Sequence, residues 1–588
     1  MTACSPSSIR PAAAGSACSV RRAATLLFAA WLLVGPATAA QLSQLLPQQL
    51  PPDATGRVER FREAPTPPPS GAGPSLQVEP LPPEEAPESA ANIPLQIEAV
   101  TLVGVTVYKP EDLAEYWKDR LGKPGKLGDL FTIAAAITTR YRNDGYVLSR
   151  AIVPAQEIED GKVEIQVVEG YVSQVIFEGN DDRPDLLRDT GERITDAKPV
   201  RVSDLERYLL LLGDQPGVNV TSVLKPSPDQ TGAADLIITV EREALQNFAT
   251  LDDRGTRYVG PDQLTAGTRI NSLFGFGDQT FIRGITTPLF PSELKAFDVN
   301  NQQTLTAEGT TLGLNLNYAE AHPGFTLQQF KLTSDASTIA VVLAQPIIRS
   351  RVENLRVTVQ GVANQYRTDI GGSTDPLLRD NIRSLRISLV YDTFDRFHGA
   401  NLAGLQLSQG IDILGASKPG AAFLSRAVGR PDYTKLNYDL SRAQELAEHW
   451  TLITAATAQT AFTPLLASEQ FGLGGSTFLR AYDPSDIIGD SGIAGKLELQ
   501  FSDQPKEVYL KSYDLYTYAD IGLVQNMTTL PGEKSSQSAA ALGVGTRFTL
   551  NDWSNGYFEV SQPLMRGVPT EGTHDHFARV FFALIAKF

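Results

Sequence analysis

The chain ends with Ala578-Arg579-Val580-Phe581-Phe582-Ala583-Leu584-Ile585-Ala586-Lys587-Phe588, the stretch that says most about its architecture. Counting back from Phe588, every second residue is apolar, and Lys587 and Arg579 fall on the opposite face. A continuous apolar face along about 10 residues, with charges opposite, is typical of a strand between lipid and a water-filled lumen. The alternative is a soluble β-sandwich, in which the apolar face would form a core.

The same alternation recurs upstream of this last strand. Leu314, Leu316 and Tyr318 alternate with asparagines, and helical periodicity is missing after Glu243. We therefore expect a transmembrane antiparallel β-barrel over residues 245–588. A region of this length accommodates roughly 14 to 18 strands with their turns.

The N-terminus indicates export. Arg10, Arg21 and Arg22 are followed by an apolar run, Ala23–Val34, and by small residues up to Ala40. This layout predicts a signal peptide over residues 1–40. The run is shorter than the ~20 residues of a spanning helix, which disfavours a retained membrane anchor.

Composition excludes several classes of protein. Cys4 and Cys18 both lie in the expected signal peptide, so the mature chain has no disulfide to stabilise a secreted β-sandwich. Removing three arginines with residues 1–40 lowers the net charge from −16 to −19. So acidic a chain lacks the clustered positive charge that nucleic-acid binding requires.

The middle of the chain divides into a linker and a repeat. Prolines crowd residues 65–92, which predicts an extended linker. Residues 93–170 and 171–244 then each read as a βααββ unit with alternating apolar strands. In the second unit, Asp214-Gln215-Pro216-Gly217-Val218 echoes Asn143-Asp144-Gly145-Tyr146-Val147 of the first.

Three motifs stand out along the chain. The first contains Tyr141, Arg142, Gly145, Tyr146, Ser149, Arg150, Pro154 and Gln156; the second is Leu479, Arg480, Ala481 and Tyr482; the third contains Tyr518, Asp520 and Gly522. The first resembles the signature of the first polypeptide-transport-associated (POTRA) domain of a known family, and the other two resemble a loop-tip motif and an inner-wall motif of that family's barrel. The family is the two-partner-secretion transporters of the Omp85 superfamily, which export haemolysins and filamentous haemagglutinin.

The resemblance implies an architecture and a function. Two periplasmic α+β POTRA domains would precede a 16-stranded outer-membrane barrel with a loop around residues 472–492 folded into it, and residues 41–64 would match the family's plug helix. The POTRA domains would receive an unfolded exoprotein, an adhesin or haemolysin, and the barrel would export it without ATP. The further partners implied are outer-membrane lipid and the barrel-assembly machinery, and we expect a monomer.

The physics of the two barrel motifs suggests a latch. A guanidinium offers a planar fork that a carboxylate accepts bidentately, so Arg480 on a loop tip and Asp520 on the wall are expected to pair. Tyr518, Asp520 and Gly522 share one strand face, which leaves room beside the carboxylate. The family's glycine is replaced by Ala481, which would be strained if that position required a positive φ. The alternative is a clasp that only stabilises the barrel.

Enzymatic functions find less support. Gly489-Asp490-Ser491-Gly492 matches the sequence around a serine-protease nucleophile, but it leads directly into an alternating strand. His574 and His576 would be only half of a metal site, and the chain has no P-loop pattern. We expect no cofactor. A barrel-assembly factor of the same superfamily and a passive porin remain as alternatives, although a porin would not explain the two βααββ units.

Overall fold

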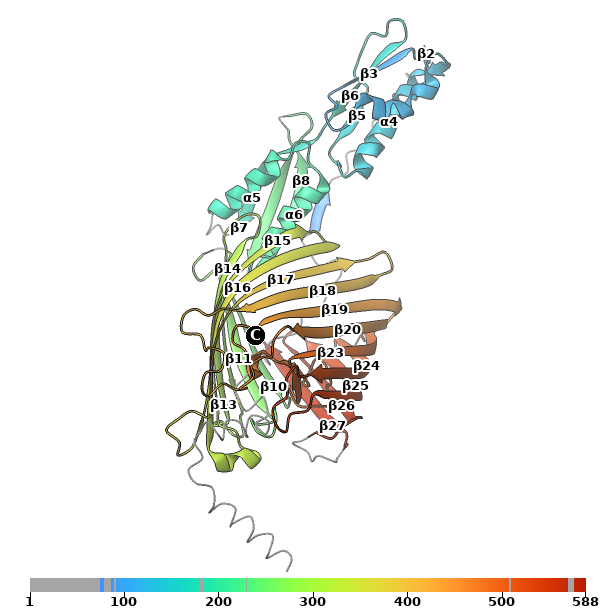
Figure 1. The fold of residues 1–588 in the computed structure, drawn as a ribbon. Coiled ribbons are helices and arrows are strands. Elements are labelled where there is room, and N and C mark those ends of the chain that lie inside the picture. The colour runs from blue at the N-terminus through green and yellow to red at the C-terminus, as the bar shows by residue number, and fades with distance from the viewer. Residues whose placement is uncertain are drawn as a thin grey trace, which may run out of the picture.

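The computed structural model describes residues 75–78, 86–88, 91–179, 184–228, 230–275, 277–506, 509–568 and 576–588. The expected signal peptide (1–40), the possible plug helix (41–64) and most of the linker (65–92) lie outside the described residues. Within them, three bodies follow one another: two small α+β units and a large barrel (Figure 1).

Unit 1 packs its helices against a small sheet. The sheet order is β3-β6-β5, and α4 covers it with Leu130, Ile133 and Ile137 fully buried. Helix α4 begins where the Lys126 backbone N donates to Asp129 Oδ2 at 2.8 Å, and it ends before Gly145, whose φ of 93° suits glycine. The elements are β2 (Pro94–Gln96), β3 (Ala99–Val103), α3 (Pro110–Leu113), η3 (Ala114–Tyr116), η4 (Lys118–Arg120), β4 (Pro124–Lys126), α4 (Leu127–Asn143), β5 (Arg150–Ile152) and β6 (Lys162–Val168).

Unit 2 repeats this plan with one addition. Its sheet order is β1-β8-β9-β7, so a short strand from the proline-dense linker, β1, forms one edge. Side chains of β8 alternate between buried and exposed positions, as a strand with one covered face requires. The elements are β1 (Ser75–Val78), β7 (Tyr171–Gly179), α5 (Pro184–Asp196), α6 (Val202–Gly213), β8 (Val218–Pro226) and β9 (Ala233–Arg242).

The expected antiparallel barrel is confirmed: sixteen strands form a closed sheet. Closure comes from pairing of the first strand with the last, for example Thr250 with Ile585. The strands are β10 (Leu245–Asp252), β11 (Gln263–Asn271), β12 (Asp278–Thr286), β13 (Leu294–Thr304), β14 (Thr311–Ala321), β15 (Leu332–Arg349), β16 (Glu353–Ile370), β17 (Leu378–Phe394), β18 (Gly399–Gly410), β19 (Thr434–Ala447), β20 (Trp450–Ala461), β23 (Ser491–Asp503), β24 (Ser512–Gln525), β25 (Ser536–Asn551), β26 (Ser554–Pro563) and β27 (Arg579–Lys587).

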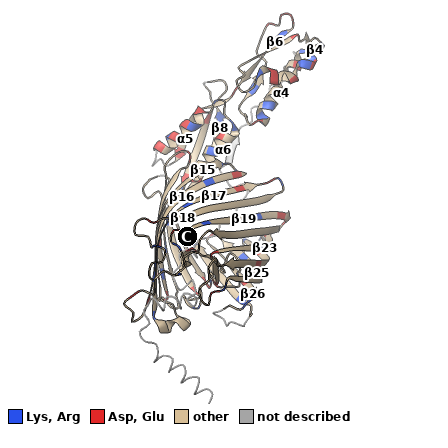
Figure 2. Ribbon diagram, viewed as in Figure 1, with Lys and Arg blue, Asp and Glu red and all other residues tan. Residues whose placement is uncertain are grey.

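The outside of the barrel is apolar. On β15, Ile339, Val341 and Leu343 are about half exposed, and their neighbours point into the lumen. Acidic and basic residues colour the helices of the two units densely, whereas most of the barrel is tan (Figure 2). No helix among the described residues is long and apolar enough to span a membrane.

Unit 2 is tied to one end of the barrel, here called the proximal end. Glu308, in the turn between β13 and β14, accepts hydrogen bonds from Arg207 Nη2 at 3.1 Å and from Tyr208 OH at 2.9 Å. Arg349 at the end of β15 makes a bidentate pair with Asp214, with both distances 2.7 Å. These contacts set helix α6 beside the mouth of the lumen.

Candidate functional site: the inward loop and the joint between the two units

Residues 462–490, between β20 and β23, form a segment called here the inward loop. It contains η6 (Ala467–Glu469) and a hairpin of β21 (Phe471–Leu473) and β22 (Ile487–Gly489). Apolar side chains of this hairpin pack on the lumen faces of β23, β24 and β25, on Ala494, Val524 and Ala541. The loop therefore lies against the inner wall of the barrel.

Arg480, near the tip of this loop, is paired with Asp520 on β24. Arg480 Nε donates to Asp520 Oδ2 and Nη2 donates to Oδ1, both at 3.1 Å, and the backbone N of Arg480 also donates to Oδ2 at 3.1 Å. Arg480 is only 3% exposed and Asp520 2%. The contact is thus a buried bidentate ion pair, which fixes the orientation of the guanidinium as well as its position.

The sequence did not reveal the other charged groups around Arg480. Arg480 Nη1 donates to Glu498 Oε2 at 2.5 Å and lies 3.8 Å from Glu559 Oε2. Arg254 donates to Glu559 at 2.8 Å and to the Arg480 carbonyl at 3.0 Å, and Arg547 donates to Glu498 at 2.8 Å. These six residues, the Arg480 cluster, comprise three carboxylates and three guanidinium groups, so their charges balance.

One signal pointed to two members of this cluster. Glu498 and Glu559 each lie in a strand whose neighbouring residues are apolar and face outward, so both carboxylates face the lumen. A buried carboxylate on a lumen face requires a cation. The sequence alone could not say which cation, because the partners come from different strands.

Tyr518 and Gly522 shape the wall around Asp520. The guanidinium carbon of Arg480 lies 3.3 Å from the centroid of the Tyr518 ring, which adds a cation–π contact. A Cβ at Gly522 would meet Leu473 Cδ1 at 2.6 Å and Leu479 Cδ1 at 3.2 Å. Gly522 therefore makes room for the apolar side chains of the loop.

The remaining tip residues anchor the backbone of the loop. Leu479 carries the left-handed conformation at the tip, with φ of 56°, whereas Ala481 is not among the described residues with positive φ. The strain considered for alanine at position 481 is therefore absent there. Tyr482 OH donates to the carbonyls of Ala540 at 3.1 Å and Arg566 at 3.2 Å.

A second ionic contact holds the base of the inward loop. Glu469 in η6 is 1% exposed, and its carboxylate lies 3.0 Å from Arg386 Nη2 on β17 and 2.8 Å from Lys435 Nζ on β19. Lys435 Nζ also donates to the Glu469 carbonyl at 2.9 Å. The loop is thus held on two parts of the barrel wall.

The sequence Gly489-Asp490-Ser491-Gly492 is the junction between loop and barrel. Asp490 is fully buried and accepts hydrogen bonds from Arg426 Nη1 at 2.8 Å and from the backbone N of Leu465 and Met527 at 2.9 Å. Ser491 Oγ accepts a hydrogen bond from the backbone N of Ala461 at 3.0 Å. These contacts show that the motif has a structural role, in which it fixes the inward loop to the start of β23.

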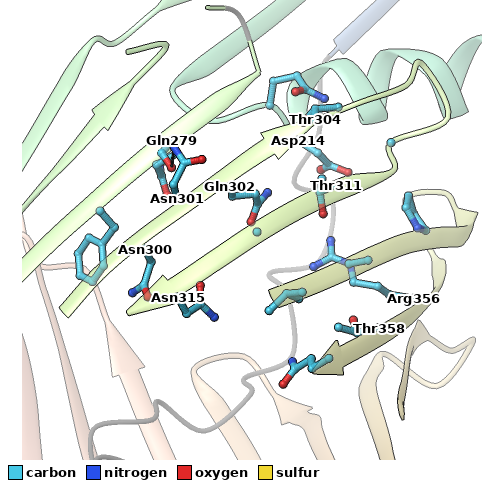
Figure 3. A pocket seen from close by; sticks show the side chains of 18 of the residues that line it. Asp214, Gln279, Asn300, Asn301, Gln302, Thr304, Thr311, Asn315, Arg356 and Thr358 are labelled. Carbon is cyan, nitrogen blue, oxygen red and sulfur yellow. Dashed lines mark hydrogen bonds between the residues drawn. The ribbon is translucent and has the colours of Figure 1, made fainter. Parts of the chain in front are cut away.

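Among the described residues, the lumen contains a larger and a smaller cavity. The larger, of about 1580 Å³, is bounded by the barrel wall and by loop residues such as Phe471 and Phe478. The smaller, of about 500 Å³, lies at the proximal end and includes Asp214 of unit 2. Five uncharged amide residues of neighbouring strands line it (Figure 3): Gln279, Asn300, Asn301, Gln302 and Asn315.

Part of the first motif lies near the joint between units 1 and 2, where Tyr141 of unit 1 is bonded to Glu169. Glu169, just after β6, accepts hydrogen bonds from Tyr141 OH at 2.7 Å and from the backbone N of Thr106 and Val107 at 2.8 and 3.0 Å. Partial burial of Glu169 opposes its ionisation, but these hydrogen bonds outweigh burial and hold its pKa below the usual value. Burial and the bond to Glu169 raise the pKa of Tyr141.

The turn after α4 reaches into unit 2. The carbonyl of Gly145 accepts a hydrogen bond from Val202 N at 3.0 Å, and Ser149 Oγ accepts one from Gly170 N at 3.0 Å. The ring of Tyr146 packs in the core of unit 1, whereas Leu148 belongs to the core of unit 2. A residue from the sequence of unit 1, Leu148, therefore helps to form the core of unit 2.

The other motif residues act within unit 1. Arg142 lies in the last turn of α4, where its carbonyl accepts a hydrogen bond from Gly145 N at 3.0 Å, and Arg150 begins β5 opposite Val168. Gln156 bonds both the N and the carbonyl of Glu164 through its side-chain amide, at 2.7 and 2.8 Å. It also donates to the Pro154 carbonyl at 3.3 Å.

Metal-binding geometry does not occur in the part of the chain that the structure describes, where no three His, Cys, Asp or Glu side chains are grouped to hold an ion. His574 lies outside the described residues.

Comparison with known proteins gives two family matches. Residues 232–548 match the model of the haemolysin secretion/activation protein ShlB/FhaC/HecB, which is more than half of the chain. Residues 95–170 match the POTRA domain of the ShlB type.

Similar proteins share both sequence and fold. The heme/hemopexin transporter protein HuxB of Haemophilus influenzae is 25% identical over 392 residues, which is 65% of this chain and 67% of that protein. The outer membrane transporter CdiB of Dickeya dadantii is 22% identical over 373 residues, 62% of this chain and 65% of that one. Among solved structures, CdiB from Escherichia coli superposes with a TM-score of 0.70 at 18% identity, covering 95% of this chain and all of that chain. CdiB from Acinetobacter baumannii gives a TM-score of 0.61 at 14% identity, covering 93% and 99%.

Proposed function

Because the chain belongs to the haemolysin secretion/activation protein family ShlB/FhaC/HecB, we propose that it exports one unfolded secreted protein through its barrel lumen. The family consists of outer-membrane transporters, not enzymes, and its POTRA domains are periplasmic. Units 1 and 2 therefore lie in the periplasm, and the proximal end of the barrel faces it. Transporters of this family export a dedicated partner protein.

The exported partner is an exoprotein of the adhesin or haemolysin type. It reaches the POTRA units unfolded, passes the proximal cavity and folds outside, and this folding draws the chain outward without ATP. The amides around the proximal cavity support this route, because each amide both donates and accepts hydrogen bonds and so suits any peptide backbone. The chain works as a monomer, and the barrel-assembly machinery inserts it.

The inward loop is the gate in this proposal, and the observation that carries it is the buried pair of Arg480 with Asp520. A loop packed against the wall leaves a lumen cavity beside it, and movement of the loop would widen that cavity. The possible plug segment, residues 41–64, would add a second closure. The Arg480 cluster is then a switch, and not merely a clasp.

Reconstitution tests the proposal. The full chain is placed in phosphatidylcholine liposomes, and the exoprotein encoded beside its gene is added unfolded, without nucleotide. We expect the exoprotein to become protected from added protease inside the liposomes, whereas an unrelated unfolded protein of similar length stays accessible. Equal protection of both proteins would indicate a passive pore, and protection of neither would contradict export by this chain.

A further inference from the structure

Two arginine side chains in the lumen have no carboxylate partner among the residues that the structure describes. They are Arg269 on β11 and Arg356 on β16, and within the described part of the chain no hydrogen bond joins either guanidinium to another residue. Arg283 on β12 shows the contrast, because its Nε donates to Asp298 Oδ2 at 2.6 Å. The positive charges of Arg269 and Arg356 are therefore not compensated by the described wall of the barrel.

These two arginines lie where the proximal cavity meets the larger cavity. The residues that line both cavities are Arg269, Phe281, Arg356, Thr358 and Gln360. Two of these residues are cations and none is an anion. Among the described residues around the proximal cavity, the one other ionisable side chain is Asp214, whose charge Arg349 compensates at 2.7 Å. The boundary between the cavities thus carries an excess of positive charge.

Aromatic rings hold the guanidinium of Arg269 without occupying its donors. Its central carbon lies 5.1 Å from the centroid of the Phe281 ring and 5.6 Å from that of the Phe248 ring. The two rings are stacked, with 6.0 Å between their centroids and 8° between their planes. A cation–π contact uses the face of a guanidinium, whereas its hydrogen bonds leave from the edge. The N–H groups of Arg269 therefore remain available to an acceptor in the lumen.

Neutral donors flank the second arginine. Arg356, Thr358 and Gln360 are alternate residues of β16, so they share its lumen face, and Figure 3 labels the first two. The Thr358 hydroxyl and the Gln360 amide can each donate a hydrogen bond beside the guanidinium. A planar guanidinium with neutral donors next to it suits a carboxylate, which accepts several hydrogen bonds at once. The same set of groups repels a cation.

We propose that Arg269 and Arg356 form an anion-binding site at the boundary of the two cavities, and that its ligands are carboxylate groups of the exported protein as it enters the lumen. The source of the carboxylates rests on the proposed export function, whereas the anion site itself does not. Acidic residues of the larger cavity, among them Asp252 and Asp439, repel a carboxylate that has passed the boundary. Binding at this site therefore remains weak enough for transit.

Ion selectivity tests the site itself. The full chain is placed in planar bilayers across a gradient of potassium chloride, and the reversal potential gives the ratio of chloride to potassium permeability. Arg269→Gln/Arg356→Gln removes both charges and keeps polar side chains, so we expect it to lower this ratio by about threefold or more. Arg269→Lys/Arg356→Lys keeps both charges and should keep the ratio. The matched control Lys331→Gln/Arg396→Gln removes two exposed charges that line neither cavity, and it should keep the ratio as well.

Peptides and secretion test the ligand. A short glutamate homopeptide, added at the proximal side, should reduce the current through the wild-type chain more strongly than a lysine homopeptide of equal length. This difference should disappear in Arg269→Gln/Arg356→Gln. In cells that express the exoprotein encoded beside the gene, at matched surface levels of folded barrel, the glutamine variant should secrete severalfold less exoprotein than the control.

The outcomes separate the site, its ligand and the export function. An unchanged permeability ratio in the glutamine variant would overturn the anion site. A lowered ratio with undiminished secretion would show a site for small ions only, and would overturn the exported protein as the source of the carboxylates. Failure of the wild-type chain and of the control to secrete the exoprotein would reject the export function, while the permeability ratio would still decide on the anion site.

Discussion

At Arg480, one guanidinium is surrounded by the carboxylates of Asp520, Glu498 and Glu559 in a site closed to water. Removal of one partner of such a group leaves buried charge without compensation, which typically costs about 3–5 kcal/mol. We expect Arg480→Ala to lower the free energy of unfolding of the barrel by about this amount, and Arg480→Lys by less, because lysine keeps the charge but not the fork. The free energy of unfolding is measured by urea unfolding in detergent micelles, with the heat-modifiable mobility of the barrel as the readout. The control is Arg396→Ala, an exposed arginine, and an equal effect of both would contradict the argument.

At Gly522, the expected effect is on the loop. A valine there would meet Leu473 and Leu479, so the loop should move away from the wall. We predict a higher single-channel conductance in planar bilayers for Gly522→Val. Gly361→Val is the matched control, because a Cβ at Gly361 meets nothing within 4 Å. Unchanged conductance in Gly522→Val would mean that the loop does not limit the pore.

Glu169 makes the packing of unit 1 sensitive to pH. Its pKa in the folded protein lies below the ordinary 4.5, so its carboxylate stabilises the contacts with Thr106, Val107 and Tyr141 above that pH. This stabilisation is lost as the pH falls from 4.5 through the lowered pKa. We expect the spread of distances between spin labels on residues 104–109 and on α4 to widen over this range, and Glu169→Gln to show the wide distribution at every pH. A wild-type distribution that does not change with pH would contradict the prediction.

At the scale of the elements, the turn between α4 and β5 contributes a side chain to the core of unit 2. Leu148 follows α4 of unit 1 but packs in the core of unit 2. Leu148→Ala should therefore cost about 2–5 kcal/mol and accelerate amide hydrogen exchange in β8 and β9. Ile133→Ala, in the core of unit 1, should instead accelerate exchange in α4. If Leu148→Ala affected only α4, the contribution of Leu148 to the core of unit 2 would be refuted.

The sequence predicted those elements whose pattern is local. Alternation of apolar and polar residues along the last strand and along Leu314–Tyr318 was sufficient to predict a barrel. Side chains of a strand point to alternate faces whatever the neighbouring strands are. The pairing of Ser75–Val78 with β8 was not predictable, because any extended segment fits a sheet edge. The placement of Leu148 was missed for a similar reason, since the repeat suggested two separate cores.

The site was predicted only in part, because the motifs are local in sequence and the other charged groups of the site are not. The motifs named Arg480 and Asp520, which the structure brings together, but the surrounding charges come from remote strands: Glu498 is 18 residues from Arg480, and Arg254 is 305 residues from Glu559. Contacts over such separations depend on the register of the whole barrel. Whether the pair gates transport stays a prediction.

On the scale of the whole molecule, the two units follow one another at one end of the barrel (Figure 1). We propose that these periplasmic units, the proximal cavity and the inward loop form one route from the periplasm to the cell surface. Contacts of Glu308 and Asp214 fix helix α6 at the proximal end, so a protein bound to unit 2 would lie beside the lumen. The central claim is that this route carries the partner and that the loop controls it.

Secretion of the exoprotein encoded beside the gene tests this claim most directly, in cells with the wild-type chain, Arg480→Ala, Asp520→Ala or the control Arg396→Ala, at matched surface levels of folded barrel. The account predicts normal secretion by the wild type and the control and a loss of most secretion in both loop variants, since both break the pair that holds the loop. Undiminished secretion in both loop variants would contradict control by the loop, and undiminished secretion in cells lacking the whole chain would contradict export by this protein.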